Sequence, residues 1–325
     1  MASAEKSYNI LKILNDHTDE DHPMNATDIC KHLSVQDIKI DRRTVYRNIA
    51  GLEQAGYDII KSGNEGWFLS RHFDTVEIKI LIDAVQQAHF LTFNKSNELI
   101  NKLLELTSSS IAHKLKKQVS ISNRPKWDNE AIYYNIDKIN TCIMRNKKLT
   151  FKYFNYSTKG KHIGRLNNYT YSVNPYFTTW FNENYYLICA TGKHANFSHY
   201  RIERMTDLII IDEPRRSIHE ITPKINDLAE YLNKSVNMFT GKPVNIRLKV
   251  DNELANQVFN QFGPNINLVP ADEEASFLNL DAVIAPGLIS WIISFGNHVK
   301  VIAPDSLKTQ IIEHCRKIQS LYSKE

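Results

Sequence analysis

The first 70 residues of the chain combine helical spacing of apolar residues with a short alternating pattern. Apolar residues recur every three or four positions in three segments, and two short apolar runs then flank the turn SGNEG. The first pattern predicts amphipathic helices and the second predicts a β-hairpin. Three helices followed by a hairpin is the order of a winged helix-turn-helix. The helices are predicted at 5–16, 27–33 and 42–55, and the strands at 58–61 and 67–70.

From residue 72 the pattern is helical again, and from residue 148 it becomes a pattern of strands. Residues 72–118 carry two apolar helical stripes, and residues 130–147 predict a further helix. Five alternating runs follow, separated by turn-rich stretches, and they predict a small barrel or curled sheet. The runs are 148–156, 169–177, 184–190, 198–205 and 207–212.

The C-terminal part of the chain alternates strands and helices. From Pro243 the pattern gives a strand, a helix, two strands, a helix that starts with Pro286, a strand, and a final helix. The order βαββαβ is that of a ferredoxin-like module. We therefore predict an α+β multidomain chain: a winged helix-turn-helix (1–70), a helical linker (71–125), a small β-barrel domain (126–216) and a ferredoxin-like domain (217–325).

Length and composition agree with a globular protein of more than one domain. The chain has 325 residues, of which 42% are hydrophobic and 23% are charged. The N-terminal stretch MASAEKSYNI lacks the apolar core of a signal peptide. No apolar run approaches the length of about 18 residues that a membrane span requires. We therefore expect a cytoplasmic protein with no membrane partner.

The chain offers few groups for catalysis or metal binding. Its cysteines form no CxxC pair or Cys/His cluster, so buried reduced thiols are predicted rather than disulfides or a zinc site. No GxSxG, HExxH, P-loop or GxGxxG motif is present. We therefore expect no enzymatic activity, no metal and no cofactor. The cysteines are Cys30, Cys142, Cys189 and Cys315.

The net charge of +4 is unevenly distributed along the chain. Residues 1–70 hold 8 Lys/Arg against 11 Asp/Glu, whereas residues 126–216 hold 14 against 8. Within the first segment, however, Lys39–Arg47 holds four basic residues and one acid. Binding of nucleic acid needs one basic face rather than a basic domain, so the acidic total does not exclude it. The basic middle segment favours an anionic ligand.

The third predicted helix carries the strongest candidate for DNA contact. Asp41 is a suitable N-cap, and Val45, Ile49 and Leu52 recur at i, i+4 and i+7 on the inner side. A helix of this kind fits the major groove, where arginine pairs with guanine or with phosphate. The alternative is a solvated charged face, but the flanking helices and hairpin favour DNA contact. The outer residues are Arg42, Arg43, Tyr46 and Arg47.

In the middle segment, tyrosines are interleaved with arginines, lysines and a histidine. Rings that stack on bases, beside cations that pair with phosphates, are typical of a nucleotide or single-stranded nucleic-acid site. The alternative is a barrel that packs its tyrosines with their hydroxyls at the rim. In the run SHYRIER, strand alternation predicts Tyr200 and Ile202 in the core, and His199, Arg201 and Glu203 on the ligand side.

The N-terminal pattern is similar to a DeoR-type winged helix. The signature of that type is a Thr-Val pair, an arginine and a downstream Leu-x-x-x-Gly. In this chain it falls at Thr44-Val45, Arg47 and Leu52…Gly56.

Over nearly its whole length the chain resembles the bacterial WYL-domain transcriptional regulators. The tripeptide that gives the family its name falls at residues 185–187 (YYL), after Pro175, and the family's arginine-bearing strand falls at residues 200–205 (YRIERM). The stretch ISFGNHVKVIAPDSLKTQII is similar to the family's C-terminal extension, called WCX. The chain departs from the family where Tyr185 replaces tryptophan and where Tyr171 and Ser198 replace basic residues.

The resemblance implies a homodimeric regulator, most often a repressor. Its winged helices would bind a double-stranded operator, and an Sm-like WYL barrel would sense a nucleotide or oligonucleotide effector. Such regulators often accompany phage-defence genes. The candidates for DNA binding are Arg42, Arg43, Thr44, Tyr46, Arg47 and Lys61. The candidates for effector binding are Tyr153, Tyr171, His199, Arg201 and Arg204.

Two other functions fit part of the pattern. One is a nucleic-acid-binding accessory protein that uses the middle barrel to modulate a partner enzyme, for example in defence; such a protein would not need a winged helix. The other is a repressor that senses a small metabolite. Sensors of that kind usually have an α/β fold, and the β-rich middle segment argues against it.

Overall fold

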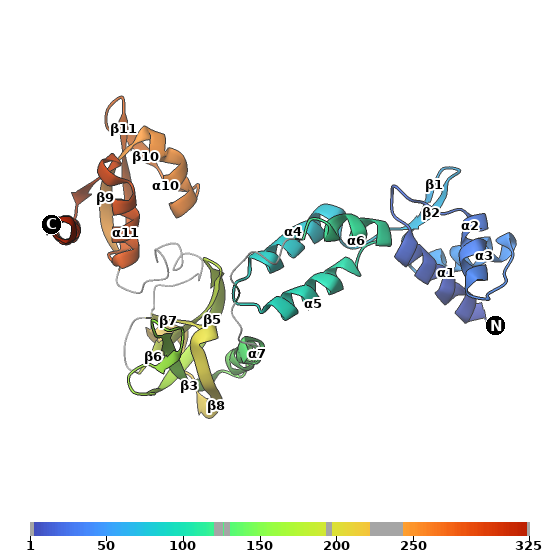
Figure 1. Ribbon diagram of the computed structural model, residues 1–325, viewed down its shortest axis with the longest axis horizontal. Coiled ribbons are helices and arrows are strands. Elements are labelled where there is room, and N and C mark those ends of the chain that lie inside the picture. The colour runs from blue at the N-terminus through green and yellow to red at the C-terminus, as the bar shows by residue number, and fades with distance from the viewer. Residues whose placement is uncertain (1–2, 120–125, 127–130, 193–196, 222–242, 324–325) are drawn as a thin grey trace. The chain divides into compact units, whose positions relative to one another are not determined.

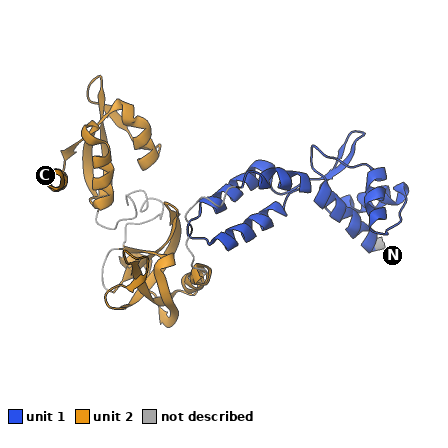
Figure 2. Cartoon of the chain, viewed as in Figure 1, with its two compact units in different colours: residues 1–130 blue, residues 131–325 orange. Residues whose placement is uncertain are grey.

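The computed structural model of the chain describes residues 3–119, 126, 131–192, 197–221 and 243–323. The chain divides into two compact units, residues 1–130 and 131–325 (Figure 2). This division is coarser than the four predicted segments. The predicted boundary at residue 125 and residues 222–242 of the predicted C-terminal domain lie outside the described residues.

Unit 1 begins with three helices and a hairpin, in the order that the sequence predicts (Figure 1). Asn25 and Asp41 cap the second and third helices by accepting backbone N–H groups. The inner faces of the helices meet in one core, which Trp67 of the hairpin closes. The elements are α1 (Ser3–His17), α2 (Ala26–Val35), α3 (Arg42–Gln54), β1 (Ile59–Ser62) and β2 (Gly66–Leu69).

The hairpin is fixed to the segment before α2 by close backbone contact. Met24 and Trp67 exchange two backbone hydrogen bonds, of 2.9 and 3.0 Å. Gly66 has φ +129°, and a Cβ atom there would lie 2.2 Å from the carbonyl carbon of Met24. Only glycine fits this approach, so the hairpin position depends on Gly66.

Three helices, rather than the predicted two, follow the hairpin. Thr92 caps the second and Ser108 caps the third, so each polar cap marks a helix start inside the apolar pattern. One core cluster joins the three helices and contains Ile78, Ile82, Ile100, Leu104 and Leu115. The helices are α4 (Thr75–Gln87), α5 (Phe93–Leu104) and α6 (Ser109–Lys116).

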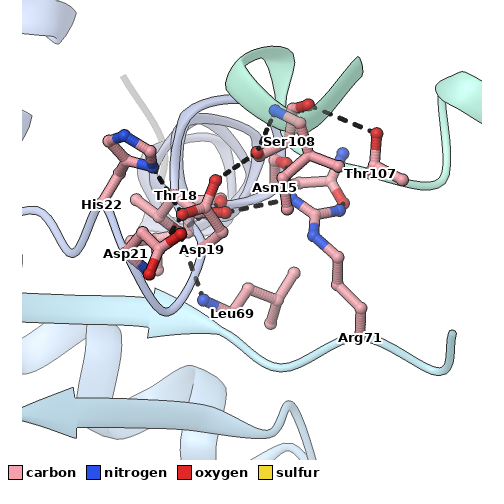
Figure 3. Close-up of polar contacts among 11 residues, drawn as sticks. Asn15, Thr18, Asp19, Asp21, His22, Leu69, Arg71, Thr107 and Ser108 are labelled. Carbon is pink, nitrogen blue, oxygen red and sulfur yellow. Dashed lines mark hydrogen bonds and ion pairs between the residues drawn. The ribbon is translucent and has the colours of Figure 1, made fainter. Parts of the chain in front are cut away.

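A polar joint connects these linker helices to the end of α1 (Figure 3). The Arg71 guanidinium donates to the carbonyl oxygens of Asn15, Thr18 and Leu106. The hydroxyl of Ser108 donates to the carboxylate of Asp19, which is 6% exposed. Because these partners come from both sides of the connection, the joint fixes the linker helices to the three-helix core.

Unit 2 begins with α7 (Ala131–Met144) and a six-stranded antiparallel sheet. Strand β3 pairs with β4, β5 and β8, and β6 and β7 continue the sheet beyond β5. The strands are β3 (Lys147–Tyr156), β4 (His162–Gly164), β5 (Thr170–Phe181), β6 (Asn184–Thr191), β7 (Phe197–Arg201) and β8 (Met205–Pro214), followed by α8 (Ile218–Ile221).

The sheet does not form the closed barrel that the sequence favoured. Among the described residues, the hydrogen-bonded ladder ends at β7, which does not pair with β8. The physical reason is that β7 stops at Arg201, where a 3-10 turn (Ile202–Arg204) leads directly into β8. That strand then pairs with β3 instead.

The C-terminal strands form a separate antiparallel sheet in the order β10-β11-β9-β12. With helices between β9 and β10 and between β11 and β12, this is the βαββαβ arrangement that the sequence pattern predicts. Its core includes Ile246, Leu248, Leu278 and Leu288. The elements are β9 (Pro243–Asp251), a 3-10 turn (Asn252–Leu254), α10 (Ala255–Phe262), β10 (Leu268–Pro270), β11 (Ala275–Val283), α11 (Pro286–Ser294), a second 3-10 turn (Gly296–His298), β12 (Val299–Ala303) and α12 (Asp305–Tyr322).

None of the described helices is both long enough and apolar enough to cross a membrane.

Candidate functional site

Helix α3 presents the predicted basic face to solvent. Val45, Ile49 and Leu52 are buried on its inner side. The carboxylate of Asp41 accepts the Thr44 backbone N–H across 2.6 Å, and this bond lowers the pKa of Asp41. The cap therefore keeps a negative charge at the helix N-terminus, where the helix dipole and the arginines are positive.

The arginines predicted on the outer side of α3 are open to solvent. Arg42, Arg43 and Arg47 are all exposed. Within the described part of the chain, none of the three takes part in a salt bridge. Tyr46 is 46% exposed, and its ring packs edge-on against Trp67 of β2 at 5.1 Å. The hairpin therefore orients the tyrosine, and the guanidinium groups remain available to a ligand.

The other two DNA-binding candidates differ in their positions. Thr44 is half-buried; its backbone N–H and its side chain both hydrogen-bond the Asp41 carboxylate, and its carbonyl oxygen accepts the Asn48 side chain at 2.7 Å. Lys61 is exposed on β1, in register with Trp67 of β2. Lys61 thus lies on the strand paired with the one that contacts Tyr46.

In unit 2, four aromatic rings form a buried cluster inside the sheet. Phe151 stacks on Tyr171 with ring centroids 5.5 Å apart and contacts Tyr200 edge-on at 5.1 Å. Tyr153 contacts Tyr200 edge-on at 5.2 Å. The exposed fractions of Tyr153, Tyr171 and Tyr200 are 7%, 8% and 7%. Two of the predicted effector residues, Tyr153 and Tyr171, are therefore mainly parts of the core.

The strand alternation predicted for SHYRIER does not hold at Glu203. Tyr200 and Ile202 are buried as predicted, but Glu203, which was predicted on the ligand side, is 1% exposed. The cause is the 3-10 turn, which has three residues per turn instead of the two-residue period of a strand. Burial raises the pKa of Glu203, and Arg201 and Arg204 only partly offset this effect.

Arg201 and Arg204 lie on either side of the buried Glu203 and are half-buried themselves. The Nε of Arg201 donates to the Tyr186 hydroxyl at 3.2 Å. The guanidinium of Arg204 lies 5.8 Å from the centroid of the Tyr156 ring. His199, the remaining effector candidate, is half-buried on β7.

A cavity of about 490 Å³ opens beside this aromatic cluster. Of the five effector candidates, only Tyr171 lines it. The hydroxyl of Tyr171 is buried and has no hydrogen-bond partner among the described residues. A buried hydroxyl without a partner is destabilising on its own. The lining residues are Lys148, Tyr169, Tyr171, Ser172, Asn174, Thr191, Gly192, Tyr200 and Arg216.

Two basic residues of this cavity were not among the effector residues predicted from the sequence. Lys148 lies on β3, where it pairs with Glu213 at 2.7 Å. Arg216 follows β8, and its backbone N–H donates to the Asn174 side chain at 2.9 Å. The run EPRRS and the pair of lysines at the start of β3 are visible in the sequence, but only the pairing of β3 with β5 and β8 brings them to one cavity.

Comparison with known families identifies two domains in unit 2. Residues 134–210 match the WYL domain, and residues 242–319 match the WCX domain. The chain therefore carries a WYL domain followed by a WCX domain, as in the transcriptional regulators that its sequence resembles. No curated protein matches the chain.

Among solved structures, the chain is similar to Proteasome accessory factor B/C (PafBC) of Arthrobacter aurescens. The two are 13% identical with a TM-score of 0.29. The match covers 94% of this chain and 47% of the other, so the chain spans about half the length of that protein.

Proposed function

We propose that this protein is a DNA-binding transcriptional regulator that reads its operator with α3. The observation that carries the proposal is the exposed set Arg42, Arg43 and Arg47 on the outer face of a capped helix. The WYL and WCX domains downstream support the same class of protein. Arginine at the start of such a helix forms bidentate bonds to guanine or charge-assisted bonds to phosphate.

The proposal also covers the effector that the WYL domain binds and the homodimer that binds DNA. The WYL domain senses an anionic effector, a nucleotide or a short single strand of nucleic acid, which occupies the cavity beside Tyr171 and extends to Arg201, the residue after the cavity-lining Tyr200. Lys148 and Arg216 supply positive charge there, and Tyr169 and Tyr200 supply aromatic surface. The regulator acts as a homodimeric repressor on paired half-sites, because two winged helices related by a two-fold axis match a palindromic operator.

The recognition helix is tested with Arg43→Ala combined with Arg47→Ala. The DNA is the fragment that the wild-type protein enriches most strongly from a randomised pool. We expect an affinity at least about tenfold lower at matched salt, because each arginine contact contributes about 1–3 kcal/mol. The circular dichroism spectrum should not change, since both side chains are exposed.

The matched control replaces two exposed lysines of the linker, Lys114→Ala with Lys117→Ala. It removes the same positive charge from a different surface and should leave the affinity within about threefold of wild type. Equal losses in the two double variants would show that only total charge matters and would refute the assignment of α3.

A further inference from the structure

Helix α4 has a second apolar face that no described part of unit 1 covers. Its inner face, with Ile78 and Ile82, belongs to the linker core. On the opposite side, Val76 is 66% exposed and Ile80 is 62% exposed. Phe73, just before the helix, adds a further exposed apolar side chain, with an exposed fraction of 42%. A helix that is apolar on both sides is normally buried on both sides.

The charges at one edge of this face are self-complementary. Lys79 and Asp83 lie one turn apart and form an ion pair within the helix, with side chains 30% and 49% exposed. In an antiparallel pair of identical helices, each edge of one helix meets the same edge of the other. A two-fold axis near Ile80 therefore brings each lysine beside the partner helix's aspartate, which gives two reciprocal ion pairs at the rim of the apolar face.

We infer that this apolar face of α4 docks against α4 of a second copy of the chain, antiparallel across a two-fold axis near Ile80. Val76 and Ile80 form the centre of the contact, and Lys79 and Asp83 form its charged edge. A contact of this kind is isologous, with the same patch used by both copies. The inference rests on the proposed homodimer, to which it assigns a surface.

The polar joint gives this surface a consequence for DNA binding. Helix α4 begins four residues after Arg71, whose guanidinium binds one carbonyl oxygen of α1, one just after α1 and one in the segment after α5. Ser109 adds a hydrogen bond of 2.6 Å to the Asp16 carbonyl oxygen. Because the three-helix core is held to the linker in this way, an axis through α4 sets the angle and separation of the two α3 helices, and with them the spacing of the half-sites.

The test is chemical cross-linking of the full-length protein without DNA. Ile80→Cys is made in a Cys315→Ser background, which removes the exposed native thiol. The reagent is a short bismaleimide, and products are separated on denaturing gels. Ile209→Cys in the same background is the control, because Ile209, on β8, is 58% exposed. We expect the Ile80→Cys protein to form covalent dimers at least about tenfold faster, because only that thiol lies at the two-fold axis.

Charge variants made in the Ile80→Cys protein then test the charged edge that Lys79 and Asp83 form. Lys79→Asp places like charges together and should slow cross-linking at least about fivefold, whereas Lys79→Asp combined with Asp83→Lys should restore the rate. Cross-linking at Ile80→Cys no faster than at Ile209→Cys would overturn the inference. If light scattering still showed a dimer in that case, the homodimer would stand and only its surface would be wrong. Suppose that Lys79→Asp combined with Asp83→Lys folds, as judged by circular dichroism, but still cross-links slowly. That result would overturn the proposed ion pairs between the two α4 helices.

Discussion

The backbone N–H of Arg201 donates a hydrogen bond to the hydroxyl of Tyr153 across 3.2 Å. This bond ties the end of β7 to β3 at the point where the strand gives way to a 3-10 turn. Burial raises the pKa of Tyr153, and the bond from Arg201 only partly offsets that effect, so the hydroxyl stays protonated. Tyr153 therefore positions the strand end, and the guanidinium of Arg201 is the group that can act on a ligand.

Replacing Arg201 with alanine should separate sensing from DNA binding. The bond to Tyr153 comes from the backbone and survives the change, so Arg201→Ala should fold and bind the enriched operator fragment as wild type does. It should lose the response to short single-stranded oligonucleotides, because it removes a cation beside the aromatic sheet. Fluorescence anisotropy of labelled operator, titrated with the oligonucleotides, measures both properties.

The matched control is Lys152→Ala, which removes a surface cation of β3 that pairs with Asp207 at 2.8 Å. This variant should respond to the oligonucleotides as wild type does. If Arg201→Ala gave effector titrations that superimpose on those of wild type, the effector would bind elsewhere.

Tyr171→Phe tests the cavity through a hydroxyl that has no hydrogen-bond partner in the described parts of the chain. The stacking on Phe151 is kept, and no hydrogen bond among these residues is lost, so the free energy of unfolding should stay the same or rise by up to about 1 kcal/mol. Affinity for mononucleotides, measured by calorimetry, should fall about tenfold, because a hydrogen bond to a charged group is worth about 1.5–3 kcal/mol.

Tyr176→Phe provides the contrast for this experiment. The hydroxyl of Tyr176 donates to the Arg216 carbonyl oxygen at 2.9 Å, so its removal should lower the free energy of unfolding by about 1 kcal/mol. Unchanged nucleotide affinity in Tyr171→Phe would exclude the cavity as the effector site.

Asp19→Asn should weaken the joint in a pH-dependent way. Burial alone would raise the pKa of Asp19, but hydrogen bonds from Ser108 and His22 outweigh it, and the pKa lies below its usual value. A carboxylate with a lowered pKa stabilises the fold above about pH 4, and this contribution is lost as the pH falls through the folded-state pKa. Asp19→Asn should lower the free energy of unfolding by about 1–3 kcal/mol at pH 7, and by progressively less below pH 4.

Urea unfolding at several pH values measures this difference. Asp21→Asn is the control, since Asp21 is exposed two residues away, and it should change stability by less than about 0.5 kcal/mol. A cost for Asp19→Asn that is constant from pH 7 to pH 3 would show that the carboxylate charge does not stabilise the joint.

Helices and strands that are marked by a pattern of neighbouring residues could be predicted from the sequence. Helix α3 follows from Asp41 at its N-cap and the i, i+4, i+7 spacing of Val45, Ile49 and Leu52, which lie within a few residues of one another. The order of helices and strands along the C-terminal module follows in the same way from local patterns. Strand β7 could not be delimited, because the 3-10 turn that ends it leaves the apolar residues Tyr200 and Ile202 at strand spacing.

By itself the sequence determined the helices and hairpin of residues 3–69, the order of elements in the C-terminal module, and which residues of α3 face the core, because these depend on periodicity and capping over a few residues. The tertiary structure alone decided which polar groups meet. Asp19 and Ser108 are 89 residues apart, and the cavity residues Lys148 and Arg216 are 68 residues apart in the sequence. Contacts of this kind depend on strand pairing and helix packing over long sequence separations, and no local pattern records them.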